Sequence, residues 1–156
     1  MRISSRKIAS CTGHSPRVPR GIRNNNPLNI RRGVQWRGLR DFATDKAFCE
    51  FKSMDYGFRA AFCILRTYFS KRGVRTLRQL ISRWAPPTEN NTEAYIRKVR
   101  LQAGLRDADS PLPPPWNPMA MGLWKDIVLA MAAVENGCDM QDYRSSCIKG
   151  WKKAFN

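Results

Sequence analysis

Carboxyl groups are the side chains of this sequence best suited to acid–base chemistry. The single histidine, His14, leaves a Ser/His/Asp or Cys/His triad without a base in the body of the chain and excludes a histidine-based metal site. The five cysteines are odd in number and include no CxxC pair, which argues against a zinc ribbon and a fully paired disulfide framework. Neither GxxxxGK[ST] nor GxGxxG occurs. We therefore expect no metal, no cofactor, and chemistry carried by Asp or Glu.

Glu135 is the first choice for a proton donor. It ends the most apolar stretch of the chain, MAMGLWKDIVLAMAAVE, where both desolvation and the negative end of a helix dipole should raise the pKa of a carboxyl group. Cleavage of a glycosidic bond needs such a protonated carboxyl, together with aromatic or amide groups that hold the sugars. The alternative is that Glu135 points into solvent beyond the core.

Two helices are predicted before the middle of the chain. Apolar side chains at helical spacing predict one from Ser53 to about Arg72, with Gly73 as its stop. Thr76 and Gln79 form a capping box that begins a second, shorter helix, which must end before the two prolines at 86–87. Both helices should place one apolar face in the core.

Three more helices are predicted in the second half. One opens at Asn91 or Thr92 and ends near Gly104, and the apolar helix that ends in Glu135 begins after an Asn-Pro pair at 117–118. Between them, residues 105–116 form a proline-stiffened surface connector. The last segment, DMQDYRSSCIKGWKKAF, has the pattern of an amphipathic helix.

The first third of the chain should contain little helix. Residues 1–20 are polar and basic and predict a flexible arm. The following Asn-, Gly- and Pro-rich run and the alternation around Phe48 and Phe51 predict a short extended or β element near residues 28–52. The expected fold is mainly α, with a single small domain over residues 21–156.

Several segments resemble a family of phage and prophage virion-associated proteins of lysozyme-like type. They are RGIRNNNPLNIRRG at 20–33, DFATDKAFCEFKSMDYGFRA at 41–60 and WAPPTENNTEAYIRKV at 84–99. The resemblance covers most of residues 21–104, and the spacing of RNNNPLNIR, ENNT and YI is specific. It implies a lysozyme-like domain that acts on bacterial peptidoglycan.

The segment VLAMAAVENG at 128–137 resembles the helix that ends in the catalytic Glu of lytic transglycosylases and related glucosaminidases. In those enzymes the Glu helix comes first and an Asn-rich segment with a Gly and a Trp follows; here the order is reversed, which implies a circular permutation. No acid precedes Asp41. Three alternatives follow: Glu135 supplies the proton, another acid does, or activity is lost.

The segment ENNTEAYIRKV is similar to a transglycosylase stretch whose Glu and Tyr line the glycan groove. The match implies Glu89 as a second catalytic candidate and Tyr95 as a substrate contact. The alternatives are that Glu89 is an ordinary loop acid beside a helix N-terminus and that Tyr95 is a core residue. A second carboxylate assisting Glu135 is expected at Asp41 or Glu50. The remaining substrate-binding candidates, whose amide or aromatic groups could hold sugars, are Asn24, Asn25, Asn26, Asn29, Trp36 and Asn91.

The charge of the chain predicts an anionic partner. Lys and Arg number 28 against 12 Asp and Glu, a formal charge of +16, which suits bacterial peptidoglycan, nucleic acid or anionic lipid equally well. Together with the resemblance, it favours a glycosidase of the muramidase or lytic transglycosylase type. The alternatives are a non-catalytic virion or wall-binding protein on a lysozyme-like scaffold and, less favoured, a nucleic-acid-binding protein, for which no helix-turn-helix, RRM or zinc-finger signature is present.

No secretion signal is expected at the start of the chain. The basic first ten residues are not followed by an apolar segment of the needed length, and no run approaches a membrane span. We therefore expect the protein in the phage virion, alongside other virion proteins, or delivered to the periplasm and cell wall by a phage particle or a holin.

Overall fold

The structure, a computed structural model, describes residues 17–156, and this part of the chain is mainly helical, as predicted. The predicted arm at residues 1–20 lies outside the described residues as far as residue 16. In chain order the elements are α1 (Arg20–Arg23), α2 (Met54–Lys71), α3 (Leu77–Trp84), α4 (Thr92–Gln102), the 3-10 turn η1 (Pro118–Ala120), α5 (Met121–Asn136), the 3-10 turn η2 (Gln141–Tyr143) and α6 (Arg144–Phe155).

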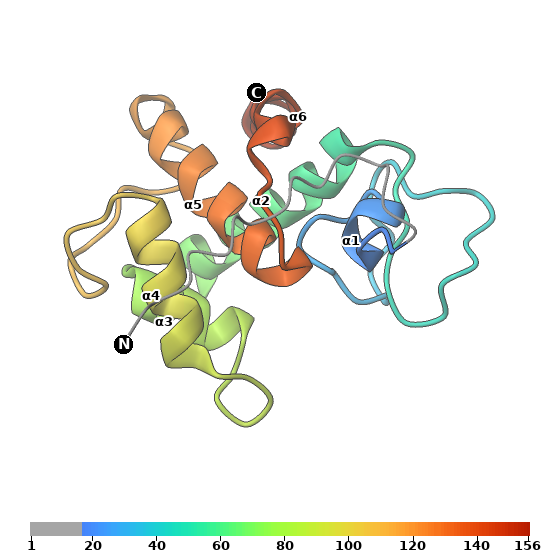
Figure 1. The fold of residues 1–156 in the computed structure, drawn as a ribbon. Coiled ribbons are helices and arrows are strands. Elements are labelled where there is room, and N and C mark those ends of the chain that lie inside the picture. The colour runs from blue at the N-terminus through green and yellow to red at the C-terminus, as the bar shows by residue number, and fades with distance from the viewer. Residues whose placement is uncertain (1–16) are drawn as a thin grey trace.

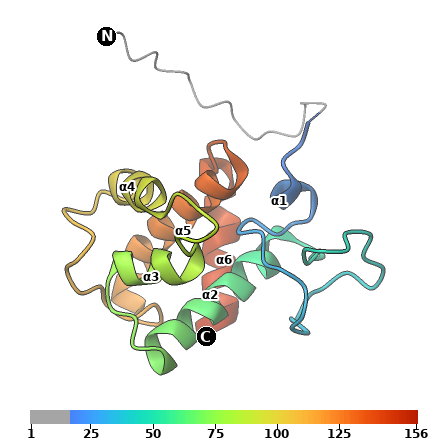
Figure 2. The same ribbon diagram turned by 90° about the horizontal axis from the view of Figure 1, so that it is seen from below.

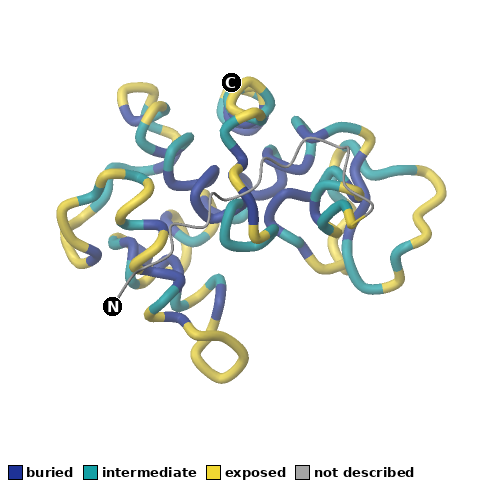
Figure 3. The backbone as a smooth tube through the Cα atoms, viewed as in Figure 1, coloured by how far each residue is buried: buried dark blue, intermediate teal, exposed yellow. Residues whose placement is uncertain are grey.

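Helix α5 is the centre of the hydrophobic core. Trp124, Ile127 and Met131 are completely buried, and the burial of each such side chain stabilises the fold by about 1.5–3 kcal/mol (Figure 3). The helix follows η1, in which the Asn117 side chain accepts from the backbone N–H of Met119, and it ends at Gly137, whose φ of 67° lies in the left-handed region. Both ends agree with the sequence prediction.

Helices α2 and α6 pack tightly against each other. A Cβ atom added to Gly150 would lie 2.5 Å from Cβ of Phe58, so only glycine permits this close approach. Helix α2 begins after Ser53, as predicted, although the Ser53 side chain makes no capping hydrogen bond.

Two hydrogen bonds hold the proline-rich connector against the helices. The indole N–H of Trp124 donates to the Pro113 carbonyl at 3.0 Å, and the indole N–H of Trp151 donates to the Pro115 carbonyl at 2.8 Å.

Helices α3 and α4 pack against each other, and both begin with the predicted caps. The Thr76 side chain accepts from the Gln79 backbone N–H, and the Gln79 side chain accepts from the Thr76 backbone N–H in return. The Asn91 side chain accepts from the N–H of Ala94 and so caps α4. Helix α4 packs against α5 on one side and α3 on the other.

Residues 24–53, here called the loop region, contain less regular structure than predicted. In place of a β element, the described chain has two isolated antiparallel bridges, Arg31 with Phe48 and Leu39 with Phe51. Buried polar side chains bind the backbone where a ladder would have done so: Asn26, completely buried, donates to the carbonyls of Ile30 and Cys49. The prediction of a short extended or β element near residues 28–52 is therefore met only by these two bridges.

The loop region lies on one side of the molecule and α3 and α4 on the other, with α2 and α5 between them (Figures 1 and 2). Short helix α1 lies beside the loop region and contacts α5. Arg20, placed in the arm from the sequence, is the first residue of α1, and its guanidinium binds the Asp45 carboxylate through two hydrogen bonds of 2.6 and 2.7 Å. The C-terminal end of α5 thus meets both sides of the molecule.

Candidate active site

The Glu135 carboxyl group lies in the last turn of α5, where side chains from three other segments reach it. The Tyr95 hydroxyl from α4 donates to Oε1 at 3.1 Å, and the indole N–H of Trp84, at the end of α3, donates to the same oxygen at 3.3 Å. From the loop region, Nδ2 of Asn29 approaches Oε2 at 3.4 Å and the Glu135 carbonyl at 3.3 Å. Oε1 therefore has two donors, whereas Oε2 has one long contact.

Burial raises the pKa of Glu135 above its ordinary value. Desolvation is the largest influence, and it outweighs the opposing effect of the donors from Asn29, Tyr95 and Trp84. The pKa of Tyr95 is raised well above its usual range, mainly by burial and further by the adjacent Glu135 carboxyl. Tyr95 therefore remains a hydrogen-bond donor, and Glu135 is the acid of this site that can release a proton.

The loop carrying Asn29 is attached directly to the end of α5. The amide nitrogen of Asn136 donates to the Pro27 carbonyl at 2.8 Å, which holds the loop against the helix turn that bears Glu135. Gly21 lies beneath both amides: a Cβ there would approach Oδ1 of Asn136 to 2.4 Å and Oδ1 of Asn29 to 3.1 Å. Asn29 itself has φ of 50°, a left-handed conformation that Asn adopts more readily than most residues.

Glu135 lines a cavity of about 340 Å³ between the two sides of the molecule. Its walls come from the loop region, α2, the end of α3, the segment between α3 and α4, and the end of α5. The lining residues are Leu28, Asn29, Ile30, Arg31, Phe48, Ile64, Tyr68, Trp84, Pro86, Glu89, Asn90 and Glu135. The rings of Tyr68 and Trp84 stand edge to face, with centroids 6.4 Å apart. Two carboxyl groups, two amides and three aromatic rings thus line one space.

Three of the sequence candidates, Glu135, Glu89 and Asn29, line this cavity, and a fourth, Tyr95, is buried and contacts the Glu135 carboxyl. Asn29 and Tyr95 both contact the Glu135 carboxyl, although they are 106 and 40 residues from it in sequence. Glu89 lines the cavity from the exposed segment between α3 and α4. The structure therefore brings together Glu135, Glu89, Tyr95 and Asn29.

The first three residues of the Asn-rich loop bind the protein instead of facing the cavity. Asn24 and Asn26 are buried, and the amide of Asn24 donates to Asp45 at 2.9 Å. The amide of Asn25 donates to the Phe51 carbonyl at 3.2 Å. These amide donors are used to close the loop region, which corrects the expectation that all four candidate asparagines of this loop contact substrate.

Trp36 and Asn91 also lie outside the cavity lining. Trp36 packs, partly buried, against the core, and its indole N–H has no partner in the described structure. Asn91 uses its side-chain oxygen to cap α4, and it is the neighbouring Asn90 that lines the cavity. A cap needs the side chain turned back toward its own helix, which explains why Asn91 cannot also face the cavity.

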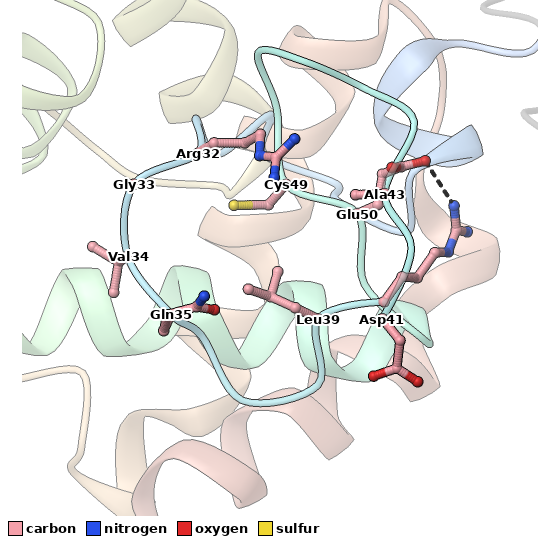
Figure 4. Close-up of a pocket in the computed structure, with 10 residues that line it drawn as sticks. Arg32, Gly33, Val34, Gln35, Leu39, Asp41, Ala43, Cys49 and Glu50 are labelled. Carbon is pink, nitrogen blue, oxygen red and sulfur yellow. Dashed lines mark hydrogen bonds and ion pairs between the residues drawn. The ribbon is translucent and has the colours of Figure 1, made fainter.

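The two acids expected to assist Glu135 line a different cavity, of about 380 Å³, enclosed by the loop region (Figure 4). Asp41 is exposed there and lies 3.8 Å from the Lys52 ammonium. Glu50 is buried, and although desolvation acts to raise its pKa, hydrogen bonds from the N–H groups of Asp45 and Thr44 and the charge of Arg40 lower it. Glu50 is a structural anion of the loop region.

The lining residues that were not candidates in the sequence include Trp84, Tyr68 and Arg31. Trp84 ends the short helix that the Thr76 capping box predicts, and the signal for its role was that a partly buried indole usually places its N–H on a partner. Tyr68 lies one turn after Ile64 on α2, which places both on one helix face. For Arg31 the sequence offered no signal beyond its place in the Asn-rich motif.

Residues 17–156 contain neither a membrane-spanning helix nor a cluster of metal-binding side chains. No helix within residues 17–156 has both the length and the apolar character needed to cross a bilayer. Over the same residues, no group of three or more His, Cys, Asp or Glu side chains is placed to hold a metal ion.

Comparison with known proteins identifies a phage family. No family model matches the chain. Protein P5 of Pseudoalteromonas phage PM2 is 38% identical in an alignment of 140 residues that covers 87% of this chain and 82% of P5. Identity at this level over most of both chains indicates common descent. This chain therefore belongs to the family of the phage protein P5.

Proposed function

We propose that this protein is a phage-associated glycosidase with a lysozyme-like, circularly permuted domain, in which Glu135 protonates the bond to be cut in the glycan of bacterial peptidoglycan. One observation carries the proposal: a buried carboxyl group with a raised pKa, fixed by Tyr95, Trp84 and Asn29, faces an open cavity. Membership of a phage protein family supports the phage association in this proposal.

The environment of Glu135 suits a general acid. A general acid must hold its proton until the leaving oxygen needs it, and a raised pKa keeps a larger share of the carboxyl protonated near neutral pH. With Oε1 bound by Tyr95 and Trp84, Oε2 is the oxygen available to substrate. The site therefore combines a carboxyl group of raised pKa with a fixed orientation.

The cavity walls suit an amino-sugar chain. Sugar rings present C–H faces that pack on aromatic rings, and Tyr68, Trp84 and Phe48 offer such rings. The amide nitrogen of exposed Asn90 donates to the Pro86 carbonyl at 3.2 Å, which leaves the side-chain oxygen of Asn90 to accept from N-acetyl N–H or hydroxyl groups. Glycan binding thus needs no group beyond those lining the cavity.

The proposed step transfers the Glu135 proton to the glycosidic oxygen as the C–O bond to the anomeric carbon breaks, so the leaving sugar departs as an alcohol and positive charge develops on the remaining sugar. In a transglycosylase, a hydroxyl of that sugar then attacks the anomeric carbon and returns its proton to the Glu135 carboxylate. In a hydrolase, water attacks, and its proton goes either to the Glu135 carboxylate or to a second carboxylate that acts as the base, in which case Glu135 takes up a proton from solvent. Glu89 is the only other carboxyl group among the lining residues. It is the candidate for activating water in a hydrolase.

The decisive experiment treats purified sacculi with wild-type protein, Glu135→Gln and a control on the same helix, Asp126→Asn. Glu135→Gln should slow product release at least about 100-fold, because the amide preserves shape and removes the acid, while Asp126→Asn should cleave at the wild-type rate. Wild-type activity in Glu135→Gln would refute the acid assignment. Glu89→Gln tests the second carboxyl in the same assay.

Mass spectrometry of the wild-type products distinguishes the two mechanisms. Anhydro ends mean attack by the sugar's own hydroxyl, whereas reducing ends mean hydrolysis, and the sugar at that end identifies the bond. If wild-type protein releases no fragments but pellets with sacculi, the protein is a wall-binding component, the role that its charge of +16 would serve without catalysis. Binding to DNA with a steep salt dependence, and no binding to sacculi, would favour nucleic acid.

A further inference from the structure

Arg31 is the one basic residue that lines the cavity beside Glu135. It is exposed, and none of the ion pairs or side-chain hydrogen bonds found within residues 17–156 involves its guanidinium. The cavity contains two carboxyl groups, Glu89 and Glu135, and neither pairs with Arg31. A positive group with open donors thus faces the space where the proposed substrate would lie.

The position of Arg31 is fixed by its surroundings. Its backbone forms an antiparallel bridge with Phe48, and its carbonyl accepts a hydrogen bond from the Cys49 thiol at 3.5 Å. Its guanidinium lies 5.0 Å from the centre of the Phe48 ring, close enough for a cation–π contact that orients the group while leaving N–H donors free. Less conformational entropy is then lost when an anion binds.

Within residues 17–156, Arg20 is paired with an internal carboxylate, whereas Arg31 is not. Its guanidinium lies over the same Phe48 ring, at 4.4 Å, but both of its bonding directions are occupied by the Asp45 carboxylate. Two arginines therefore share one ring, one with an internal carboxylate and one without. The planar guanidinium matches a carboxylate in a two-bond arrangement, so the vacant position suits an external carboxylate.

We infer that Arg31, stacked on Phe48, forms a carboxylate-binding subsite beside Glu135 and makes the site selective for glycan strands that carry carboxylates. This inference rests on the proposed function, because it concerns the same cavity. In peptidoglycan such a group comes either from the lactyl ether of muramic acid or from the peptide attached to it. Neutral amino-sugar chains of the chitin type lack both.

The test measures binding and cleavage of three soluble glycan preparations: native strands with peptides, strands stripped of peptides by an amidase, and strands whose carboxylates have all been converted to methylamides. Binding is measured with the Glu135→Gln protein so that the ligand stays intact. Arg31→Gln added to this protein should weaken binding of carboxylate-bearing strands about three- to tenfold at low salt and leave binding of the methylamide strands unchanged. Arg97→Gln, the same charge change at an exposed α4 position outside the cavity, is the control.

The three preparations identify the source of the carboxylate. Stripped strands carry free lactyl carboxylates, because the amidase cuts the amide bond that joins the lactyl group to the peptide, whereas native strands carry their carboxylates on the peptide. An Arg31-dependent preference confined to stripped strands assigns the carboxylate to the lactyl group, one confined to native strands assigns it to the peptide, and one found with both means that the subsite accepts either. With otherwise wild-type protein, Arg31→Gln should raise KM on the preferred strands with little change in kcat. Equal binding of all three preparations, or an equal loss from Arg97→Gln, would overturn the subsite.

Failure of the proposed function has a different signature. If the wild-type protein cleaves no preparation but Arg31→Gln still selectively weakens binding of carboxylate-bearing strands, the glycosidase proposal fails and the carboxylate subsite stands. If cleavage proceeds at equal rates on all three preparations, with no effect of Arg31→Gln, the carboxylate subsite fails and the glycosidase proposal stands.

Discussion

The helical region, α2 to α6, and the loop region are held together by different forces. The helical region is apolar inside, with α5 surrounded by other helices. By contrast, three of the four buried polar residues of the described chain, Asn24, Asn26 and Glu50, belong to the loop region. Hydrogen bonds are directional and leave a penalty when one partner is lost, whereas apolar packing depends on volume. The loop region is therefore the part whose shape depends on individual side chains.

The candidate active site crosses the boundary between these regions. Glu135, Tyr95 and Trp84 come from helices, while Asn29 comes from the loop region. Stability of the core and alignment of the site should thus be separable by mutation, and the predictions below use that difference.

The largest effect is expected in the helical region. Trp124→Ala should lower the free energy of unfolding by about 3–5 kcal/mol, because it leaves a cavity in the core and removes the donor to the Pro113 carbonyl. Denaturant unfolding measures the loss. Trp116→Ala, at a position 38% exposed, is the control and should cost much less. Equal losses would mean that α5 does not dominate stability.

A slightly smaller and more local effect is expected in the loop region. Asn26→Ala leaves the N–H and carbonyl of Ile30 and the carbonyl of Cys49 without their side-chain partner, at a cost of about 2–4 kcal/mol. Hydrogen exchange should quicken in residues 24–52 before it does in α5, and cleavage should fall. Uniformly faster exchange would show that the two regions unfold as one unit. Asn156→Ala, at the exposed chain end, serves as the control.

A smaller change tests the contact between the regions. The new methyl of Gly21→Ala would lie 2.4 Å from Oδ1 of Asn136 and 2.8 Å from the Asn26 carbonyl, so α1 or the loop must move, costing about 1–3 kcal/mol. Because Asn29 shares this contact, kcat should fall about tenfold. Gly122→Ala in α5, where nothing lies within 4 Å of the new Cβ, should instead stabilise by about 0.5–1 kcal/mol. A fully active Gly21→Ala would separate the contact from catalysis.

The smallest change concerns a single proton. The Tyr95 hydroxyl donates to Glu135 and so lowers the pKa of that carboxyl; Tyr95→Phe should raise it further, with a stability change within about 1.5 kcal/mol. A general acid works while protonated, so the fall in cleavage rate with rising pH should move to higher pH in Tyr95→Phe. Tyr68→Phe, whose hydroxyl does not bind Glu135, should leave the midpoint of the pH–rate profile in place. A shift to lower pH would contradict this account.

Stability should show the matching pH dependence. Because the pKa of folded Glu135 lies above its ordinary value, the folded state holds more protons than the unfolded state between those two values. Stability therefore declines as pH rises through that window, and Glu135→Gln should lack this decline. Thermal unfolding of both proteins across pH measures it. Parallel curves would mean that Glu135 is not buried as described.

The helices could be predicted because their signals are local. The Thr76 capping box, the glycine that ends α5 and the apolar spacing of α2 each lie within one segment. The loop region could not be predicted to the same depth, because an asparagine supports a sugar contact and a backbone contact equally well in sequence. Asn26 and Asn29 differ only in which way the folded loop turns each amide.

The contact between Trp84 and Glu135 also has an optical consequence. An indole held 3.3 Å from a carboxyl oxygen should emit differently when that carboxyl carries a proton and when it does not, because a neutral carboxyl quenches indole fluorescence more strongly than a carboxylate. The difference between the emission of the wild-type protein and that of Trp84→Phe, followed across pH, would trace the ionisation of this one acid in the resting protein. Glycan bound in the cavity as proposed would change the same signal, so the indole that contacts Glu135 would also report when the cavity is filled.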